Sequence, residues 1–201
     1  MAVTHRTVVE GVLAAAVVLI ASVPSARAEH APRAHVRTWD VPAQRLVRYA
    51  LRQSLLTRQL ADRLQRSDVF VYVGYDCELP DSLMGRLSFM AFAPGVRYVS
   101  VHLSCKAPLL VQLAALGHEL RHAVEIAEDP SVVDDASLLD SYRRIGFQSR
   151  TRMPSMLSYD TQAAIDAGAQ VWRELRGPGA ARFDGPSAGL SEGNGATVNA
   201  D

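Results

Sequence analysis

The residues best suited to chemistry are two histidines and a glutamate in the run His118-Glu119-Leu120-Arg121-His122. Residues four apart on an α-helix lie one turn above each other, so both imidazoles can bind one metal ion. Glu119 is rotated by one residue and lies beside the ligands. A carboxylate there can take a proton from metal-bound water without binding the metal itself. The spacing predicts His118 and His122 as metal ligands and Glu119 as general base.

The sequence around these residues predicts a helix from Pro108 to about Glu128. A proline suits the first turn of a helix, and Asp129-Pro130 ends it. Apolar side chains recur on one face, which defines the side expected to meet the core, and the two histidines lie on the opposite side. These apolar residues are Leu109, Leu113, Leu116, Leu120 and Val124.

Strand patterns and further helices surround this motif. One amphipathic helix is expected from Pro42 to Gln65. Three strands are expected at 69–73, 86–92 and 96–103, the last two joined as an antiparallel hairpin by Ala93-Pro94-Gly95. In the last strand apolar and polar residues alternate, so His102 should face away from the core. Helices at 134–145 and 161–175 follow, which gives an α+β domain.

The two ends of the chain are predicted to lie outside the folded domain. An apolar run at 11–23 precedes a small-x-small pattern, which predicts a signal peptide at 1–28, cleaved after Ala28. The alternative is an uncleaved anchor, but spanning a bilayer takes roughly 20 apolar residues. A mobile lead-in is expected at 29–40, the domain at 41–176 and a disordered tail at 177–201. We therefore expect a periplasmic or secreted protein with no stable membrane span after cleavage.

The charge balance and the two cysteines indicate which binding partners and which covalent link to expect. The 21 basic and 21 acidic residues balance, so no whole-protein field would attract nucleic acid or an anionic membrane, and no nucleic-acid partner is expected. Cys77 and Cys105 are the only cysteines. In an oxidising compartment such a pair favours one structural disulfide over two buried free thiols.

The run from His118 to Val124 resembles the active-site helix of the zincin metallopeptidases, especially the thermolysin-like gluzincins. The order of a backing helix, a small three-stranded sheet, the HExxH helix and later helices is also similar to the minimal gluzincin core, over about residues 41–176. The resemblance implies a zincin-like fold, a Zn²⁺ cofactor and hydrolysis of amide bonds in a peptide or protein substrate. The metzincin variant is excluded, because Glu125 stands where it requires glycine.

The third metal ligand is not marked, because the gluzincin motif N-E-x-x-S-D is absent. Asp160 and Glu125 are the first candidates, with a helix N-cap and a solvated or ligand-supporting glutamate as their respective alternatives. An aspartate ligand would make the chain an aspzincin-like variant. Further candidates for the third ligand are Asp140, Asp166 and Glu174, and side chains available to stabilise an oxyanion are Tyr159, His102 and Tyr142.

Two other functions compete with an exported zinc peptidase. The missing third-ligand motif favours a non-catalytic zinc-binding or interaction domain of the cell envelope. If the histidines are structural, the chain is instead an exported domain without metal. Oligomeric state, substrate and cleavage specificity are not indicated by any pattern in the chain.

Overall fold

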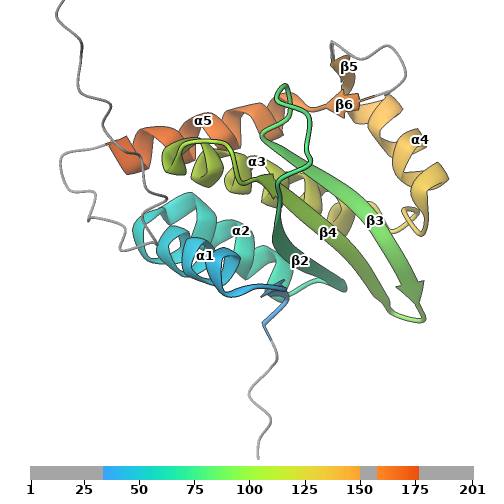
Figure 1. Ribbon diagram of the computed structural model, residues 1–201. Helices are drawn as coiled ribbons and strands as arrows, with labels where there is room; N and C mark the ends of the chain where they lie inside the picture. The colour runs from blue at the N-terminus through green and yellow to red at the C-terminus, as the bar shows by residue number, and fades with distance from the viewer. Residues whose placement is uncertain (1–33, 150–157, 177–201) are drawn as a thin grey trace, which may run out of the picture. The chain divides into compact units, whose positions relative to one another are not determined.

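The computed structural model describes residues 34–149 and 158–176. The expected signal peptide at 1–28 and the expected tail at 177–201 lie outside these residues, as does the start of the expected lead-in. The described part has an α+β architecture, with five helices and a small mixed sheet (Figure 1). No helix in it is long and apolar enough to cross a membrane.

The main sheet has four strands in the order β1-β2-β4-β3. Their bounds are Val36–Thr38, Val69–Asp76, Gly85–Ala93 and Val96–Ser104 for β1, β2, β3 and β4. β1 and β4 pair with β2 in parallel, and β3 pairs with β4 antiparallel. The last two therefore form the expected hairpin, and Gly95 adopts a φ of 76° in its turn, where glycine avoids the steric cost of a side chain.

The expectation of a three-stranded main sheet was wrong by one, because β1 lies in the range expected to be a mobile lead-in, and β5 and β6 were not expected either. β1 has three residues, too few to produce an alternating pattern in the sequence. It is fixed by its pairing with β2, in which Val36 is opposite Val71 and Thr38 is opposite Val73. Parallel pairing of this kind joins segments far apart in the chain and leaves no local signal.

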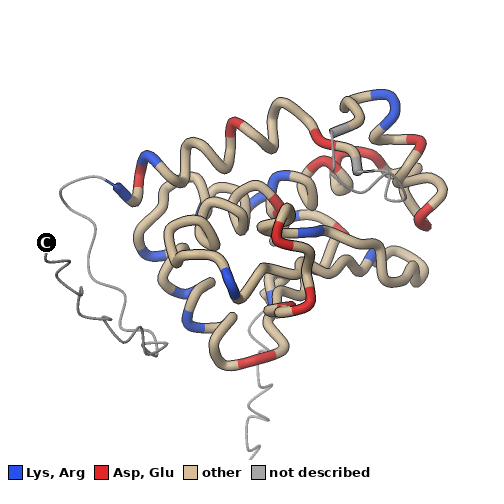
Figure 2. The backbone as a smooth tube through the Cα atoms, turned by 45° about the horizontal axis from the view of Figure 1, so that its top comes forward, with Lys and Arg blue, Asp and Glu red and all other residues tan. Residues whose placement is uncertain are grey.

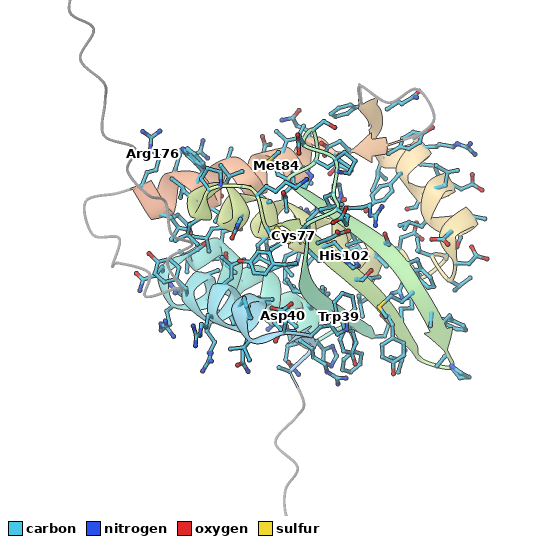
Figure 3. All side chains as sticks on the ribbon, viewed as in Figure 1. Trp39, Asp40, Cys77, Met84, His102 and Arg176 are labelled. Carbon is cyan, nitrogen blue, oxygen red and sulfur yellow. A yellow bond between two sulfur atoms is a disulfide. The ribbon has the colours of Figure 1, made fainter. Side chains whose placement is uncertain are left out.

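One face of the sheet meets the helices. Val69, Val71 and Val73 on β2 are fully buried, as are Val99, Val101 and Leu103 on β4. The intervening residues point to the other face, where His102 contacts Trp39 with 5.1 Å between ring centroids. Figure 3 shows these two labelled residues near each other. The predicted orientation of His102 is confirmed.

The expected single helix at 42–65 is two helices, α1 (Val41–Gln53) and α2 (Leu55–Gln65). Ser54 separates them with an extended backbone, and its hydroxyl accepts a hydrogen bond from the Thr57 N–H. A serine in this position caps the start of the second helix. Glu174 completes the junction, because its carboxylate accepts hydrogen bonds from the Ser54 hydroxyl and the Leu56 N–H.

α3 (Leu109–Glu128) is the central helix, and α5 (Gln162–Arg176) packs beside it (Figure 1). Glycines allow this close approach. A Cβ on Gly117 would lie 2.5 Å from the Val171 side chain, and one on Gly168 would lie 3.2 Å from the Ala114 carbonyl oxygen. The expected apolar face of α3 is confirmed, since Leu116 and Leu120 are fully buried.

Between α3 and α5 the chain forms α4 (Asp135–Ile145), β5 (Phe147–Ser149) and β6 (Ser158–Asp160). β5 and β6 pair antiparallel as a separate two-stranded sheet. Cys77 and Cys105 form a disulfide, as predicted, and it links the segments that follow β2 and β4. β6 leads directly into α5, and this connection brings Asp160 to α3.

Candidate metal centre

His118 and His122 lie one turn apart on α3 and face each other. Their Nε2 atoms are 3.2 Å apart, and their rings meet edge to face with centroids 4.8 Å apart. The side chain of His122 is only 6% exposed and that of His118 is 23% exposed. The helical spacing thus brings two imidazole nitrogens together in a largely enclosed position.

Asp160 joins the two histidines from the end of β6. Its Oδ1 lies 3.4 Å from His118 Nε2 and 3.6 Å from His122 Nε2. The three ligand atoms all lie within 4.8 Å of one another, so this cluster could hold a metal ion. Two imidazoles and one carboxylate form a donor set that fits Zn²⁺, although imidazole also suits other transition metals.

The N-cap expected at Asp160 is instead Thr161. The Thr161 hydroxyl oxygen accepts from the Ala164 N–H at 3.1 Å, which is the capping bond of α5. Asp160 Oδ1 accepts a hydrogen bond from the adjacent Thr161 N–H, at 2.7 Å. Because Thr161 caps the helix, the Asp160 carboxylate can face the histidines.

Glu125 supports the cluster from behind. Its Oε2 lies 2.8 Å from His122 Nδ1, the ring nitrogen that faces away from His118 and Asp160. Its Oε1 accepts a hydrogen bond from the Thr161 hydroxyl at 2.7 Å. Glu125 is therefore not among the three converging groups. It holds the tautomer of His122 that leaves Nε2 free to bind a metal.

His118 is oriented by α5. The backbone of Ala164 on α5 lies close enough to its ring to favour the protonated form. Burial and the neighbouring His122 lower the pKa of His118, although Asp160 and Glu125 act in the other direction. His122 thus has a carboxylate partner on its outer nitrogen, as metal-binding histidines often do.

The pKa of His122 changes in the opposite direction. Burial disfavours its protonated form, but hydrogen bonds to Asp160 and Glu125 and the charge of Glu119 outweigh burial and raise its pKa to about 9. In the protein without metal, a proton on His122 therefore compensates the surrounding carboxylates. A bound cation would take over this role, since it needs the neutral imidazole.

Glu119 lies between α3 and the first residues of β3. It is buried, at 6% exposure, and the nearby Leu87 backbone favours its ionised form. A Cβ on Gly85 would lie 2.8 Å from Glu119 Oε1, so glycine is needed for this approach. Burial raises the pKa of Glu119 to about 7, while the charge of His122 opposes this rise.

Tyr142 on α4 covers the outer side of the cluster. Its ring meets the His122 ring edge to face at 5.2 Å. Its hydroxyl is buried and has no hydrogen-bond partner among the described residues. Burial and the nearby carboxylates of Glu125, Glu119 and Asp160 raise the pKa of Tyr142 well above its usual value, so the hydroxyl keeps its proton.

No protein family model, curated protein or solved structure matches this chain. The site must therefore be interpreted from its own geometry.

Most of the other candidate metal ligands and oxyanion donors make their contacts outside the cluster. Asp140 and Asp166 are bound to neighbours on their own helices, Arg143 and Gln162 respectively, and Glu174 accepts hydrogen bonds from Ser54 and Leu56 at the start of α2. Among the possible oxyanion donors, Tyr159 is hydrogen bonded to Arg143, and His102 lies on the outer face of the main sheet. Only Tyr142 contacts the cluster.

Two residues with clear roles were not singled out from the sequence. Thr161 and its neighbour Asp160 are both residue types that cap helices, so local sequence does not distinguish them. Gly85 carried no signal, because its role depends on the approach of β3 to α3. A contact between elements that are far apart in the sequence leaves no local sequence pattern.

Proposed function

We propose that this protein is a zinc-dependent hydrolase that cleaves amide bonds in peptides. The convergence of His118, His122 and Asp160 within 4.8 Å, with Glu119 buried next to them on the same helix, carries the proposal. Three protein ligands leave a coordination position open, which is typical of catalytic rather than structural zinc sites. A bound Zn²⁺ would supply Lewis acidity, which acidifies water and polarises a carbonyl group.

Glu119 acts as the proton carrier in this proposal. It follows His118 in the chain, so its side chain is rotated by about 100° around α3 from that ligand. The close approach of Gly85 and the neighbouring Leu87 backbone hold its carboxylate against β3. Glu119 accepts a proton from the attacking water and passes it to the leaving amine nitrogen.

The position of β3 supports a peptide substrate. β3 is the last strand of the main sheet in the described residues, and it pairs on only one side, with β4. Its other edge begins at Gly85, against Glu119. An extended peptide can add to such an edge through backbone hydrogen bonds, which would place an amide group next to the cluster.

Tyr142 is the proposed stabiliser of the charge that develops on the substrate oxygen. It is a protonated donor without a partner among the described residues, and its ring already contacts a ligand. A donor positioned before the reaction stabilises an oxyanion without reorganisation.

We further propose that the domain is zincin-like, with aspartate as third ligand, and that it works outside the cytoplasm. The helix that carries the motif, the antiparallel strand beside it and the third ligand near a following helix support the first point. The Cys77–Cys105 disulfide and the small-x-small pattern before Ala28 support the second.

Metal content is the first test. The protein is reconstituted with zinc, freed of excess metal and measured by mass spectrometry. We expect about one zinc per chain in the wild type and in Glu119→Gln, and none in His118→Ala or Asp160→Ala. Asp166→Ala is the matched control, since it removes an exposed carboxylate from α5 without touching the cluster. Absence of zinc in the reconstituted wild type would reject the proposal.

Hydrolysis separates an enzyme from a zinc-binding module. Quenched fluorescent peptides of mixed sequence are incubated with the zinc-loaded wild type and with zinc-loaded Glu119→Gln. An enzyme loses turnover in the variant by a large factor while keeping its metal. Stoichiometric zinc without Glu119-dependent hydrolysis of any peptide would instead indicate the non-catalytic zinc-binding domain.

A further inference from the structure

Arginines are concentrated on α1 and α2. Residues 41–66 contain six arginines and only one acidic residue, Asp62, and all seven side chains are exposed. By contrast, residues 119–140 contain seven acidic residues and one arginine. Figure 2 shows several basic segments close together on α1 and α2. A chain without net charge therefore has one distinctly basic surface, formed by Arg45, Arg48, Arg52, Arg58, Arg63 and Arg66.

The arginines follow the exposed side of each helix. On α1, Arg45, Arg48 and Arg52 are spaced by three and four residues, which places them in one row. On α2, Arg58 and Arg66 lie eight residues apart on the exposed side. The opposite sides of both helices face the core through residues such as Leu46 and Leu60. We call the exposed sides of α1 and α2 together the basic face.

Most of these charges are not neutralised within the described part of the chain. There, the side chains of Arg45, Arg52 and Arg66 make no ion pair or hydrogen bond, and Arg48 reaches only the amide oxygen of Gln44. Arg63 is the exception, because it pairs with Glu128. The basic face therefore keeps a positive potential that an anionic partner can meet.

Two aliphatic side chains extend from the same face. Val41 is 57% exposed at the start of α1, one turn before Arg45, and Leu55 is 54% exposed at the start of α2, one turn before Arg58. Tyr49, the one aromatic residue of the two helices, is buried. Exposed aromatic rings would favour single-stranded nucleic acid, whereas exposed aliphatic groups among arginines suit the interface of a bilayer.

We propose that the basic face binds the surface of an anionic lipid bilayer, with Val41 and Leu55 entering the headgroup region. In Figure 1, β6, which ends at Asp160, lies away from α1 and α2. This binding is peripheral and does not depend on the proposed hydrolase activity.

The test measures partitioning of the full chain onto vesicles. Vesicles of phosphatidylcholine with about 30% phosphatidylglycerol are compared with phosphatidylcholine alone, at about 0.1 M and about 1 M salt. The triple variant Arg45→Gln, Arg48→Gln, Arg52→Gln is compared with the control triple Arg86→Gln, Arg143→Gln, Arg144→Gln, which removes the same charge elsewhere. All variants keep residues 1–33, so any contribution of the apolar run at 11–23 is common to them.

We expect the first triple to lose on the order of 100-fold in partitioning to anionic vesicles, since each arginine near such a surface contributes about a factor of five. The control triple should change little, and high salt should abolish the difference. Val41→Ser with Leu55→Ser should weaken vesicle binding further. Equal losses in both triples, or binding of duplex DNA that the Val41 and Leu55 changes leave intact while vesicle binding is absent, would overturn the proposal.

Discussion

The candidate metal cluster depends on which nitrogen of each histidine is left free. Glu125 holds Nδ1 of His122, and the Nε2 atoms of both histidines lie toward Asp160. Carboxylate partners of this kind also increase the basicity of a metal-binding imidazole. Glu125 should therefore affect metal binding without touching the metal.

Replacing Glu125 with glutamine should weaken zinc binding by about 10-fold or more, because an amide oxygen keeps the hydrogen bond to His122 but loses the negative charge. Competition against a chromophoric chelator measures the affinity. Glu128→Gln is the matched control, since it removes the same charge from the exposed end of α3 and should change the affinity little. Equal affinities of the two variants would show that Glu125 does not support His122.

Tyr142→Phe should leave the unfolding free energy unchanged or raise it by up to about 1 kcal/mol, because the lost hydroxyl has no partner among the described residues. Urea denaturation measures this. In the comparison variant Tyr75→Phe, a hydrogen bond to Gln112 is lost, and we expect a decrease of about 1 kcal/mol. If Tyr142 stabilises the oxyanion, its variant also loses peptide turnover on the order of 100-fold. A clear loss of stability in Tyr142→Phe would show that the hydroxyl has a structural partner.

The sequence predicted those site residues whose relation is local. His118, Glu119 and His122 lie within five positions of one helix, so the helical period alone relates them. Asp160 is 38 residues beyond His122, and its approach depends on how β6 turns into α5. Spacing alone could not decide between Asp160 and Glu125 as the third ligand. Glu125 lies close to His122 on the same helix, and Asp160 lies in a later segment that can fold back onto that helix.

At the scale of elements, boundaries set by capping were harder to predict than elements set by periodicity. The apolar stripe of α3 and the alternation of β4 were read correctly. The break at Ser54 was missed, because leucines continue at helical spacing on both sides of it. The break is stabilised by Glu174, a residue 120 positions away, through its bond to the Ser54 hydroxyl.

Arg97 ties three elements together. Its guanidinium is buried at the start of β4, pairs with Asp68 before β2 and donates to the carbonyl oxygens of Ile126 and Asp129 at the end of α3. Carbonyl groups at the end of a helix lack partners within the helix, so the positive side chain satisfies them. Because Asp68 can be protonated, this ion pair also makes the stability of the fold depend on pH.

The hydrogen bonds from Arg97 lower the pKa of Asp68 in the folded protein. A carboxyl with a lowered pKa contributes stability that is fully present above its unfolded value of about 3.9 and is lost as the pH falls through the folded value. The wild type should therefore exceed Asp68→Asn in stability at pH 6, and the difference should shrink below pH 4. Urea denaturation across this range measures it. The stability of Asp62→Asn, an exposed change on α2, should vary with pH in the same way as that of the wild type. If the stability of Asp68→Asn also varied in that way, the lowered pKa of Asp68 would not be the cause.

At the scale of the whole molecule, the disulfide ties the exits of two parallel strands. Cys77 follows β2 and Cys105 follows β4, and the segment between them contains all of β3 and its turn. β3 provides the glycine against which Glu119 packs. The disulfide therefore restrains the part of the sheet that is joined to the site and closes a large loop in the unfolded chain.

Replacing both cysteines with alanine should lower the unfolding free energy by about 3.5 kcal/mol. The sequence separation of 28 residues sets this value, because the bond removes the closure entropy of that loop from the unfolded state. Urea denaturation of the wild type with a reductant should reproduce the midpoint of the double variant, whose own midpoint should not respond to the reductant. If the reduced wild type, with both thiols titrated as free, kept the midpoint of the oxidised protein, the pairing would have no role in stability. The position of β3 would then depend on its contacts with β4 and α3 alone.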